Sequence, residues 1–177
     1  MTTLNKPIIM TAMMGKQDFA WADGLRRRYY PPERNMAPAH ITLFHHLPPR
    51  ALDEIKQAVI DITRYNAPPE TMLQRLIHLG SGVGYQLHSP ELLAMRMELA
   101  DRFHGLLTAQ DQQVPRLHIT VQNKVSAKEA KDLMTLLAQD FDPERFRSKG
   151  WRCNIIWMAH GSRLANGRSE VKPARFP

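Results

Sequence analysis

The chain alternates between short runs with a two-residue apolar repeat and longer stretches whose apolar residues recur every three to four positions. The first kind of run predicts half-buried strands, because successive side chains of a strand point to opposite faces. The second kind predicts helices with one apolar face. The first half is expected to contain a strand at 7–14, a helix at 17–30 that stops before Pro31-Pro32, a strand at 40–47, a helix carrying Leu52, Ile55, Val59 and Ile62, and a strand at 71–79.

The same order of elements returns after a glycine-rich turn at 80–84. Ser89-Pro90-Glu91 predicts a helix start with a capping serine, and Ser126 with Glu129 has the spacing of a capping box. The second half is expected to contain a strand at 83–88, a helix with the apolar stripe Leu92, Leu99, Phe103 and Leu106, a strand at 116–122, a helix carrying Leu133, Leu136 and Leu137, a strand at 151–159 and a short strand at 171–176.

The two halves are nearly equal in length up to their third element. From Pro7 to His40 is 33 positions, and from Val83 to His118 is 35. Internal repeats usually pack against each other. We therefore expect a single domain over residues 1–177, made of two pseudo-repeats at about 1–80 and 81–177 that pack about a pseudo-twofold axis.

A short sequence motif, His-Ile-Thr followed by an apolar residue, is repeated near the start of the third element of each half, as HITL at 40–43 and HITV at 118–121. Strand alternation places His40 and Thr42 on one face, and likewise His118 and Thr120. A single His-x-Thr means little, since any half-buried strand can contain one. Two copies in matching positions of a repeat favour a paired site over two unrelated structural histidines.

Composition narrows the class of protein. The chain has 177 residues, 43% of them apolar and 23% charged, which is ordinary for a globular protein. Cys153 is the only cysteine, which rules out an internal disulfide and fits a reducing cytoplasm. The apolar run at 7–14 is too short for a membrane span and lacks the flanks of an export signal. We expect a cytoplasmic protein with no membrane partner.

The net charge of +7, from 24 Lys and Arg against 17 Asp and Glu, favours polyanionic or phosphate-bearing ligands. Two histidines suit chemistry at phosphorus, because imidazole with its pKa of about 6.5 serves as acid or base near neutrality. In-line displacement needs a base on the attacking oxygen and an acid on the departing one. Histidines on opposite walls of a cleft would provide both, with the threonine hydroxyls bonding the phosphate oxygens.

Paired His-x-Thr strands, one in each half, resemble the signature of the 2H phosphoesterase superfamily, the 2′-5′ RNA ligase-like proteins. The resemblance covers nearly the whole chain, including both motifs, their separation of 78 positions and the order of strands and helices. The phrase HITLFHHLP at 40–48 is close to the family's usual first motif. By position, the family's catalytic pairs fall on His40 with Thr42 and on His118 with Thr120.

The resemblance implies a bilobal α+β fold with two antiparallel sheets facing a central cleft and helices outside. It implies metal-independent hydrolysis of a 2′,3′-cyclic phosphate on an RNA end or a nucleotide, with no cofactor and no protein partner. We assign His118 as the base and His40 as the acid. Two alternatives stay open: a non-catalytic RNA-binding module on the same fold, and residual 2′-5′ RNA ligase activity.

Substrate contacts are expected beside the two motifs. The family's ligase-named branch often has an arginine after the second motif, where this chain has Gln122 and Lys124. Both are candidate substrate-binding residues, and Lys124 supplies a point charge in place of an arginine fork. Phe44 shares the predicted face of His40, where it stacks on a base or packs the cleft floor.

Two further clusters have plainer interpretations. His45 and His46 fit no standard zinc spacing, so we interpret them as structural or rim residues, with His46 on the predicted face of His40. The run at 26–30, three arginines and two tyrosines, fits either a nucleic-acid contact or a solvated helix end. We favour the helix end.

Overall fold

The computed structural model describes residues 6–143 and 151–159. Its strands are β1 (Ile8–Met14), β2 (Ile41–Leu47), β3 (Glu70–His78), β4 (Val83–His88), β5 (His118–Gln122) and β6 (Trp151–Ala159). Its helices are α1 (Lys16–Tyr29), α2 (Leu52–Tyr65), α3 (Pro90–Arg102), α4 (Ala109–Gln112) and α5 (Ala127–Asp140), with 3₁₀ turns at Pro32–Arg34, Pro49–Ala51 and His104–Leu106.

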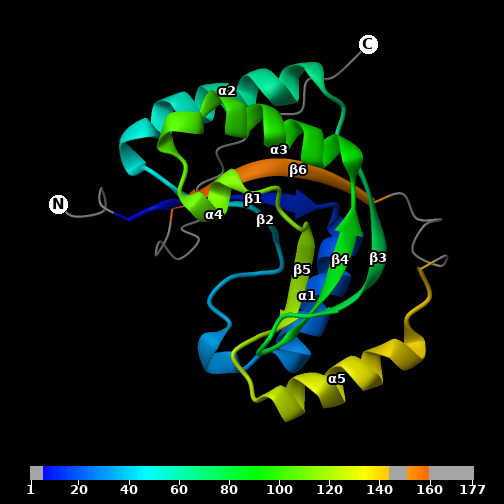
Figure 1. Ribbon diagram of the computed structural model, residues 1–177. Coiled ribbons are helices and arrows are strands. Elements are labelled where there is room, and N and C mark those ends of the chain that lie inside the picture. The colour runs from blue at the N-terminus through cyan, green and yellow to red at the C-terminus, as the bar shows by residue number, and fades with distance from the viewer. Residues whose placement is uncertain (1–5, 144–150, 160–177) are drawn as a thin grey trace.

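The strands form a curled antiparallel sheet in the order β1-β2-β5-β4-β3-β6, and β6 also pairs with β1, which closes the ring. Figure 1 shows this curl, with α2 and α3 side by side along one part of it and α5 at the opposite end. The α+β class and the antiparallel pairing are confirmed. The division into two facing sheets and into two pseudo-repeats stays a prediction.

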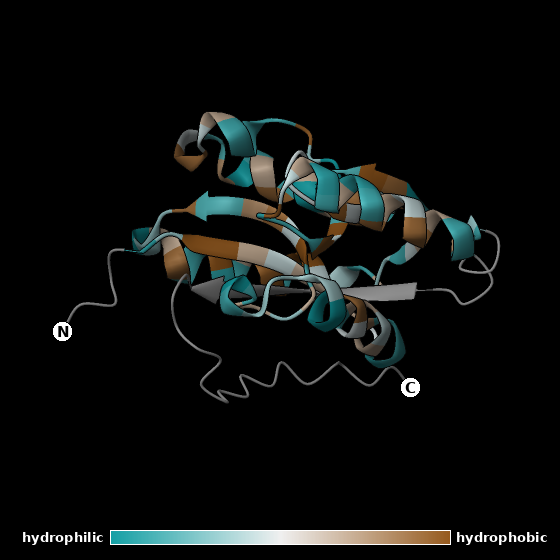
Figure 2. Ribbon diagram, turned by 90° about the horizontal axis from the view of Figure 1, so that it is seen from below, coloured by the Kyte–Doolittle hydropathy of each residue, from teal (hydrophilic) through white to brown (hydrophobic). Residues whose placement is uncertain are grey.

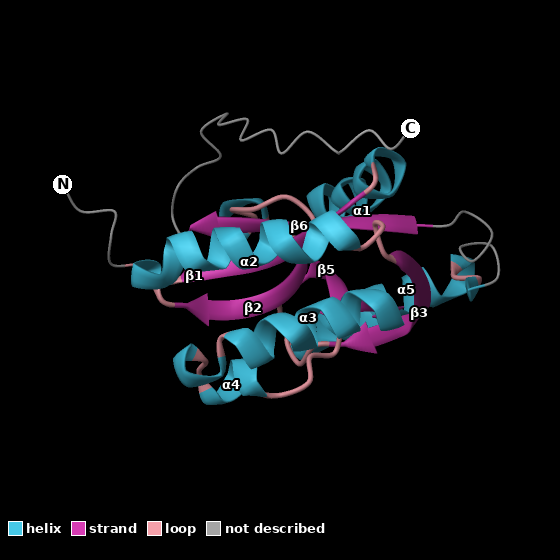
Figure 3. Ribbon diagram, turned by 90° about the horizontal axis from the view of Figure 1, so that it is seen from above, coloured by secondary structure: helices cyan, strands magenta, loops and turns pink. Residues whose placement is uncertain are grey.

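The hydrophobic core lies between the helices and one face of the sheet. On that face the cross-strand row Ala12, Ile41, Ile119 and Tyr85 is at most 4% exposed. The helices contribute their apolar stripes to the same core, among them the stripe of α2 through Ile55. Figure 2 shows both hydrophilic and hydrophobic residues along the helices, and Figure 3 shows α2 and α3 lying next to each other over the strands. The side chains at the alternate positions of these strands point to the other face of the sheet.

Local signals predicted most element boundaries. The Ser89 hydroxyl accepts a hydrogen bond from Leu92 N, and Ser126 with Glu129 forms the expected capping box. The helix α3 is shorter than the sequence predicted. It ends at Arg102, and Leu106 lies in a 3₁₀ turn instead of in the helix. Gly105 lies in that turn, and glycine is a poor helix former. The short helix α4 was not predicted, and the strand expected at 171–176 lies outside the described residues.

The glycine-rich segment is the turn between β3 and β4, as predicted. Gly80 has a φ of 80°, which glycine adopts without steric cost. Gly82 approaches β5 so closely that a Cβ there would lie 2.0 Å from the backbone oxygen of Gln122. The turn therefore packs directly against the end of the second His-Thr strand.

Candidate active site

The two His-Thr strands are neighbours in the sheet. β2 and β5 pair antiparallel through Ile41 and Ile119, which are the same position of the two motifs. The residues next to this pair are the four motif histidines and threonines. In an antiparallel register His40 therefore lies opposite Thr120, and Thr42 lies opposite His118.

This register changes the predicted position of the histidines. The sequence interpretation placed them on opposite walls of a cleft, whereas the structure places them side by side on one surface. His40 and His118 are diagonal neighbours, and such positions lie about 7–8 Å apart in an antiparallel pair. Ile41 and Ile119 are 0% exposed on the core face, so the motif residues occupy the opposite, polar face. The diagonal spacing leaves room for a phosphate between the two imidazoles.

The two imidazoles are held by matching hydrogen bonds. His40 Nδ1 lies 2.7 Å from the carbonyl oxygen of Pro38, and His118 Nδ1 lies 2.7 Å from that of Arg116. A carbonyl oxygen only accepts, so each Nδ1 carries the proton and donates it. In the neutral form each Nε2 then has a free lone pair, which can accept a proton. Each ring can therefore act as a base when neutral and as an acid when protonated.

The surroundings of both histidines disfavour the charged form. Burial lowers the pKa of His40 and of His118 below the ordinary histidine value, because the imidazolium loses its hydration. The positive field of Arg26 lowers the pKa of His40 further, and that of Arg116 lowers the pKa of His118. The positive field of His45 makes a smaller contribution in the same direction to both pKa shifts. A bound phosphate anion would oppose these fields and favour protonation of one ring.

Arg26 is a residue that the sequence interpretation missed. It was expected in a solvated helix end, but its side chain is only 6% exposed. Its Nη1 donates to the carbonyl oxygen of Thr120 at 3.0 Å, and its Nε donates to Asn35 Oδ1 at 2.7 Å and to Ala37 O at 3.0 Å. Its guanidinium lies 4.2 Å from the centre of the Tyr30 ring. One arginine thus joins the second motif to the loop that leads into the first.

Asp23, one helical turn before Arg26, holds the same loop from α1. Its Oδ1 accepts from the backbone N–H of Ala39 at 3.0 Å, directly before His40. Its Oδ2 pairs with Arg27, whose own side chain is 74% exposed, as predicted for a helix end. The position of His40 is therefore set by the polar face of α1 as well as by β2.

A buried carboxylate fixes the other end of β2. Asp111 is 1% exposed and accepts from the backbone N–H groups of His45 and His46, each at 2.9 Å. It also lies 3.3 Å from His45 Nδ1. Burial alone would raise the pKa of Asp111, but these hydrogen bonds reverse the shift and lower it. The ring of His45, with 48% of its side chain exposed, is thereby held by Asp111 at this end of β2.

Phe44 does not lie on the face of His40, which corrects the predicted alternation. The pairing of β2 with β1 shifts by one residue between Thr42 and Phe44, so Leu43 is an extra residue in a bulge. Beyond the bulge the faces are exchanged. Phe44 is 0% exposed and packs beneath the guanidinium of Arg96, which is 4.4 Å from the ring centre. Phe44 is a core residue here and offers no surface to a substrate.

The register also shows which polar residues share a row with the motifs. Thr11 of β1 lies opposite Thr42, and beyond His118 the row continues through Gln86 of β4 to Arg75 of β3. Arg75 Nε donates to Gln86 Oε1 at 2.9 Å. Gln86 and Arg75 belong to no sequence motif, and only the order of the strands in the sheet brings them to this face.

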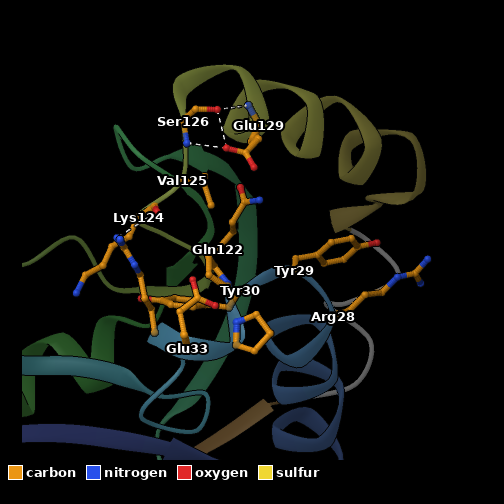
Figure 4. A pocket seen from close by; sticks show the side chains of 12 residues that line it. Arg28, Tyr29, Tyr30, Glu33, Gln122, Lys124, Val125, Ser126 and Glu129 are labelled. Carbon is orange, nitrogen blue, oxygen red and sulfur yellow. Dashed lines mark hydrogen bonds between the residues drawn. The ribbon is translucent and has the colours of Figure 1, made fainter.

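Gln122 and Lys124, the two other predicted substrate contacts, line a pocket beyond the end of β5 (Figure 4). Gln122 is 7% exposed, and Lys124 lies on the surface with a φ of 60°. Neither motif histidine lines this pocket. A register shift between β4 and β5 pairs Gln122 with Val83, which is 0% exposed, so Gln122 lies on the core face of the sheet and not on the histidine surface.

The structure thus combines an α+β fold with two motif histidines on adjacent strands, each held through its Nδ1. Residues 16–154 match the 2′-5′ RNA ligase superfamily, and this range contains both motifs. The chain belongs to that superfamily, whose members are enzymes of the 2H phosphoesterase type. The family favours an RNA-type substrate and phosphoesterase-like or ligase-like activity. No curated protein matches the chain.

Within 6–143 and 151–159, no group of three His, Cys, Asp or Glu side chains is arranged to hold a metal ion. Over the same residues, no helix has the length and apolar character needed to cross a membrane.

Proposed function

We propose that the protein hydrolyses 2′,3′-cyclic phosphates of RNA ends or nucleotides, with His40 and His118 as the acid/base pair. The observation that carries this proposal is the matched pair of Nδ1 hydrogen bonds on adjacent strands. They hold two imidazoles in the same tautomer on one surface, about 7–8 Å apart as diagonal neighbours. Membership of the 2′-5′ RNA ligase superfamily supports a phosphodiester substrate.

In the proposed reaction, water attacks the phosphorus of the cyclic ester. His118 Nε2 takes a proton from that water, and His40, in its imidazolium form, gives its Nε2 proton to the departing ribose oxygen. One P–O bond forms and one breaks, which yields a phosphate monoester and a free hydroxyl. Proton transfer of this kind typically contributes about 10²–10⁴ in rate. The hydroxyls of Thr42 and Thr120, on the same face, bond the non-bridging oxygens.

The negative charge of the substrate requires cations near this surface. Arg116 is exposed, and its backbone carbonyl holds the His118 ring at 2.7 Å, so its side chain starts two residues from that histidine. Arg75 lies in the same cross-strand row, two strands from His118. His45 is half exposed on β2, the strand that begins directly after His40, and its field contributes to the pKa shifts of both motif histidines. These three side chains supply positive charge or hydrogen bonds around the phosphate.

The function is tested with purified full-length protein and a panel of 2′,3′-cyclic phosphates, from mononucleotides to RNA oligomers. We expect a phosphate monoester from at least one of them, with a rate that EDTA leaves unchanged. Loss of activity with EDTA would instead indicate a metallohydrolase. Salt-sensitive RNA binding without any product would favour the non-catalytic alternative. Joining of RNA ends with a 2′-5′ linkage would favour the ligase.

The pH dependence of kcat/KM should have its maximum below about pH 6.5, the ordinary histidine value. The base must be neutral, so activity falls as the pH drops through the pKa of His118. The acid must be protonated, so activity falls as the pH rises through the pKa of His40. Both pKa values are lowered by burial, which moves both limbs toward acid.

This prediction is checked by measuring kcat/KM between about pH 4.5 and pH 8.5 at constant ionic strength. His118→Asn should remove the acidic limb from the residual activity, and His40→Asn the alkaline limb. If His118→Asn instead removes the alkaline limb and His40→Asn removes the acidic limb, then His40 is the base and His118 is the acid. A wild-type maximum above about pH 7.5 would contradict the effect of burial on the two histidines.

A further inference from the structure

Gln86 and Arg75 extend the histidine surface, the sheet face that carries both motifs, across two further strands. Gln86 of β4 pairs directly with His118, and Arg75 of β3 pairs with Gln86. Figure 1 shows β5, β4 and β3 side by side in this order. Both neighbours of Gln86 along β4, Tyr85 and Leu87, are 4% exposed in the core. The Gln86 side chain therefore points to the opposite face, beside the His118 ring.

A bulge in β3 places Arg75 on this face. Leu73 pairs with Leu87 on the core face, and the register then shifts by one residue, which leaves Gln74 as an extra residue. Without the shift, Gln74 would lie opposite Gln86, and Arg75 would point to the core. With the shift, the arginine is exposed on the polar face and lies next to the Gln86 amide. Bulges commonly re-aim a side chain in this way.

The pair of Arg75 and Gln86 presents hydrogen-bond donors and a positive charge. Arg75 Nε donates to Gln86 Oε1 at 2.9 Å, which occupies the acceptor of the amide. Within the described part of the chain, Gln86 Nε2 and the two Nη atoms of Arg75 form no hydrogen bond, and no carboxylate pairs with Arg75. Free donors beside a guanidinium fit the oxygens of a phosphate. A nucleobase edge carries donors as well as acceptors, so it fits this pair less well.

The pair lies beside the position of the reacting phosphate, on the side away from β2. The cyclic phosphate is placed between His40 and His118, over the midline between β2 and β5. Neighbouring strands are about 4.8 Å apart, so Gln86 on β4 lies about 7 Å from that midline. The hydrogen bond to Gln86 holds the Arg75 side chain at the same position. A phosphate on the 5′ oxygen of the same nucleotide, across the ribose from the cyclic ester, is at a comparable distance.

We propose that Gln86 and Arg75 bind a second phosphate of the substrate, the one on the 5′ oxygen of the nucleotide that carries the cyclic ester. The proposal rests on the proposed function, because it takes the cyclic phosphate to lie between His40 and His118. The second phosphate is a diester in an RNA strand and a monoester in a nucleotide 5′-phosphate. A nucleoside 2′,3′-cyclic phosphate without it leaves the pair unused. The pair thus selects substrates that carry a further phosphate.

The test compares adenosine 2′,3′-cyclic phosphate with the same ester bearing a 5′-phosphate, and with a diadenosine that ends in the cyclic ester. For the wild type we expect kcat/KM to be about tenfold higher with a second phosphate, mainly through a lower KM, as one charge-assisted hydrogen bond implies. A preference for the dinucleotide identifies an RNA strand as the source of this phosphate, and a preference for the 5′-phosphate alone identifies a mononucleotide. Equal kcat/KM for all of these esters would overturn the proposal.

Variants are compared by the ratio of kcat/KM with and without the second phosphate, because this ratio cancels a change in the chemical step. Arg75→Met should remove most of the preference. Gln86→Glu should reverse it, since the new carboxylate pairs with Arg75 and repels the phosphate. The matched control is Arg64→Met on the exposed surface of α2, which removes the same charge and should keep the wild-type ratio. A wild-type ratio in Arg75→Met, or an equal loss in Arg64→Met, would overturn the proposal.

A binding measurement keeps the site testable if no cyclic ester is hydrolysed, in which case the proposed function fails. Calorimetric titration compares adenosine 3′-phosphate with adenosine 3′,5′-bisphosphate, which differ only in the second phosphate. About tenfold tighter binding of the bisphosphate, lost in Arg75→Met and kept in Arg64→Met, would support the second-phosphate site. Equal affinity of the wild type for both nucleotides would overturn it. Tm values close to the wild type show that the variants fold, as expected for changes at the surface.

Discussion

Replacing His40 or His118 by asparagine is expected to lower kcat for 2′,3′-cyclic phosphate hydrolysis by about 10²–10⁴. The substitution is chosen from the hydrogen bonds of the two rings. The asparagine Nδ2 can donate to the same carbonyl oxygen that His40 or His118 Nδ1 reaches at 2.7 Å. The variants therefore lose Nε2, the atom proposed to transfer the proton, and keep the local backbone contact. Steady-state kinetics with each variant measures the effect.

The double variant provides a further check. Each single variant keeps one of the two proton transfers, so His40→Asn with His118→Asn should lose more activity than either change alone. His104→Asn, in the exposed 3₁₀ turn after α3, is the matched control and should keep the wild-type kcat. Tm values close to the wild type show that the variants fold. Hydrolysis at the wild-type rate by both single variants would contradict the paired-histidine mechanism.

Arg26→Lys is expected to lower kcat about a hundredfold with little change in KM, because small displacements of catalytic groups cost about that much. Lysine keeps the charge but has a single nitrogen. It cannot reach the carbonyl oxygen of Thr120 while also bonding Asn35 and Ala37, as the arginine does at 2.7–3.0 Å. The loop before His40 and the second motif then lose their common contact. Kinetics that separate kcat from KM measure this loss.

The same change should lower the free energy of unfolding by about 1–3 kcal/mol, because a buried acceptor loses its donor. The kcat effect must therefore be measured well below the Tm of the variant. Arg64→Lys on the exposed surface of α2 is the control and should alter neither quantity. If Arg26→Lys is less stable but keeps the wild-type kcat, then Arg26 stabilises the fold and does not position the histidines.

Much of the local structure could be predicted because its causes are short-range. Strand alternation placed His40 with Thr42 and His118 with Thr120, and the structure keeps both threonines partly exposed opposite the buried Ile41. Helix starts at Ser89 and Ser126 followed from capping, which involves residues three positions apart. Such signals depend on neighbouring residues alone.

The errors came from features that depend on partners far along the chain. Alternation predicted Phe44 beside His40, but the bulge at Leu43 arises where β2 pairs with β1. A run of three arginines at a helix end is usually solvated, yet Arg26 is buried because β5 lies against α1 and offers the Thr120 carbonyl. Nothing within a few residues of either position signals such a partner.

The sequence by itself identified the superfamily through its two His-x-Thr motifs, and strand alternation sets each His-Thr pair on one face. Tertiary structure alone decided that β2 and β5 are neighbours, so that His40 and His118 share a surface. It also decided that Gln122 is buried in the lining of a pocket, where its Oε1 accepts no hydrogen bond from the residues that the structure describes. The physical reason is that alternation is a property of one strand, whereas register and burial arise only when distant strands and helices pack together.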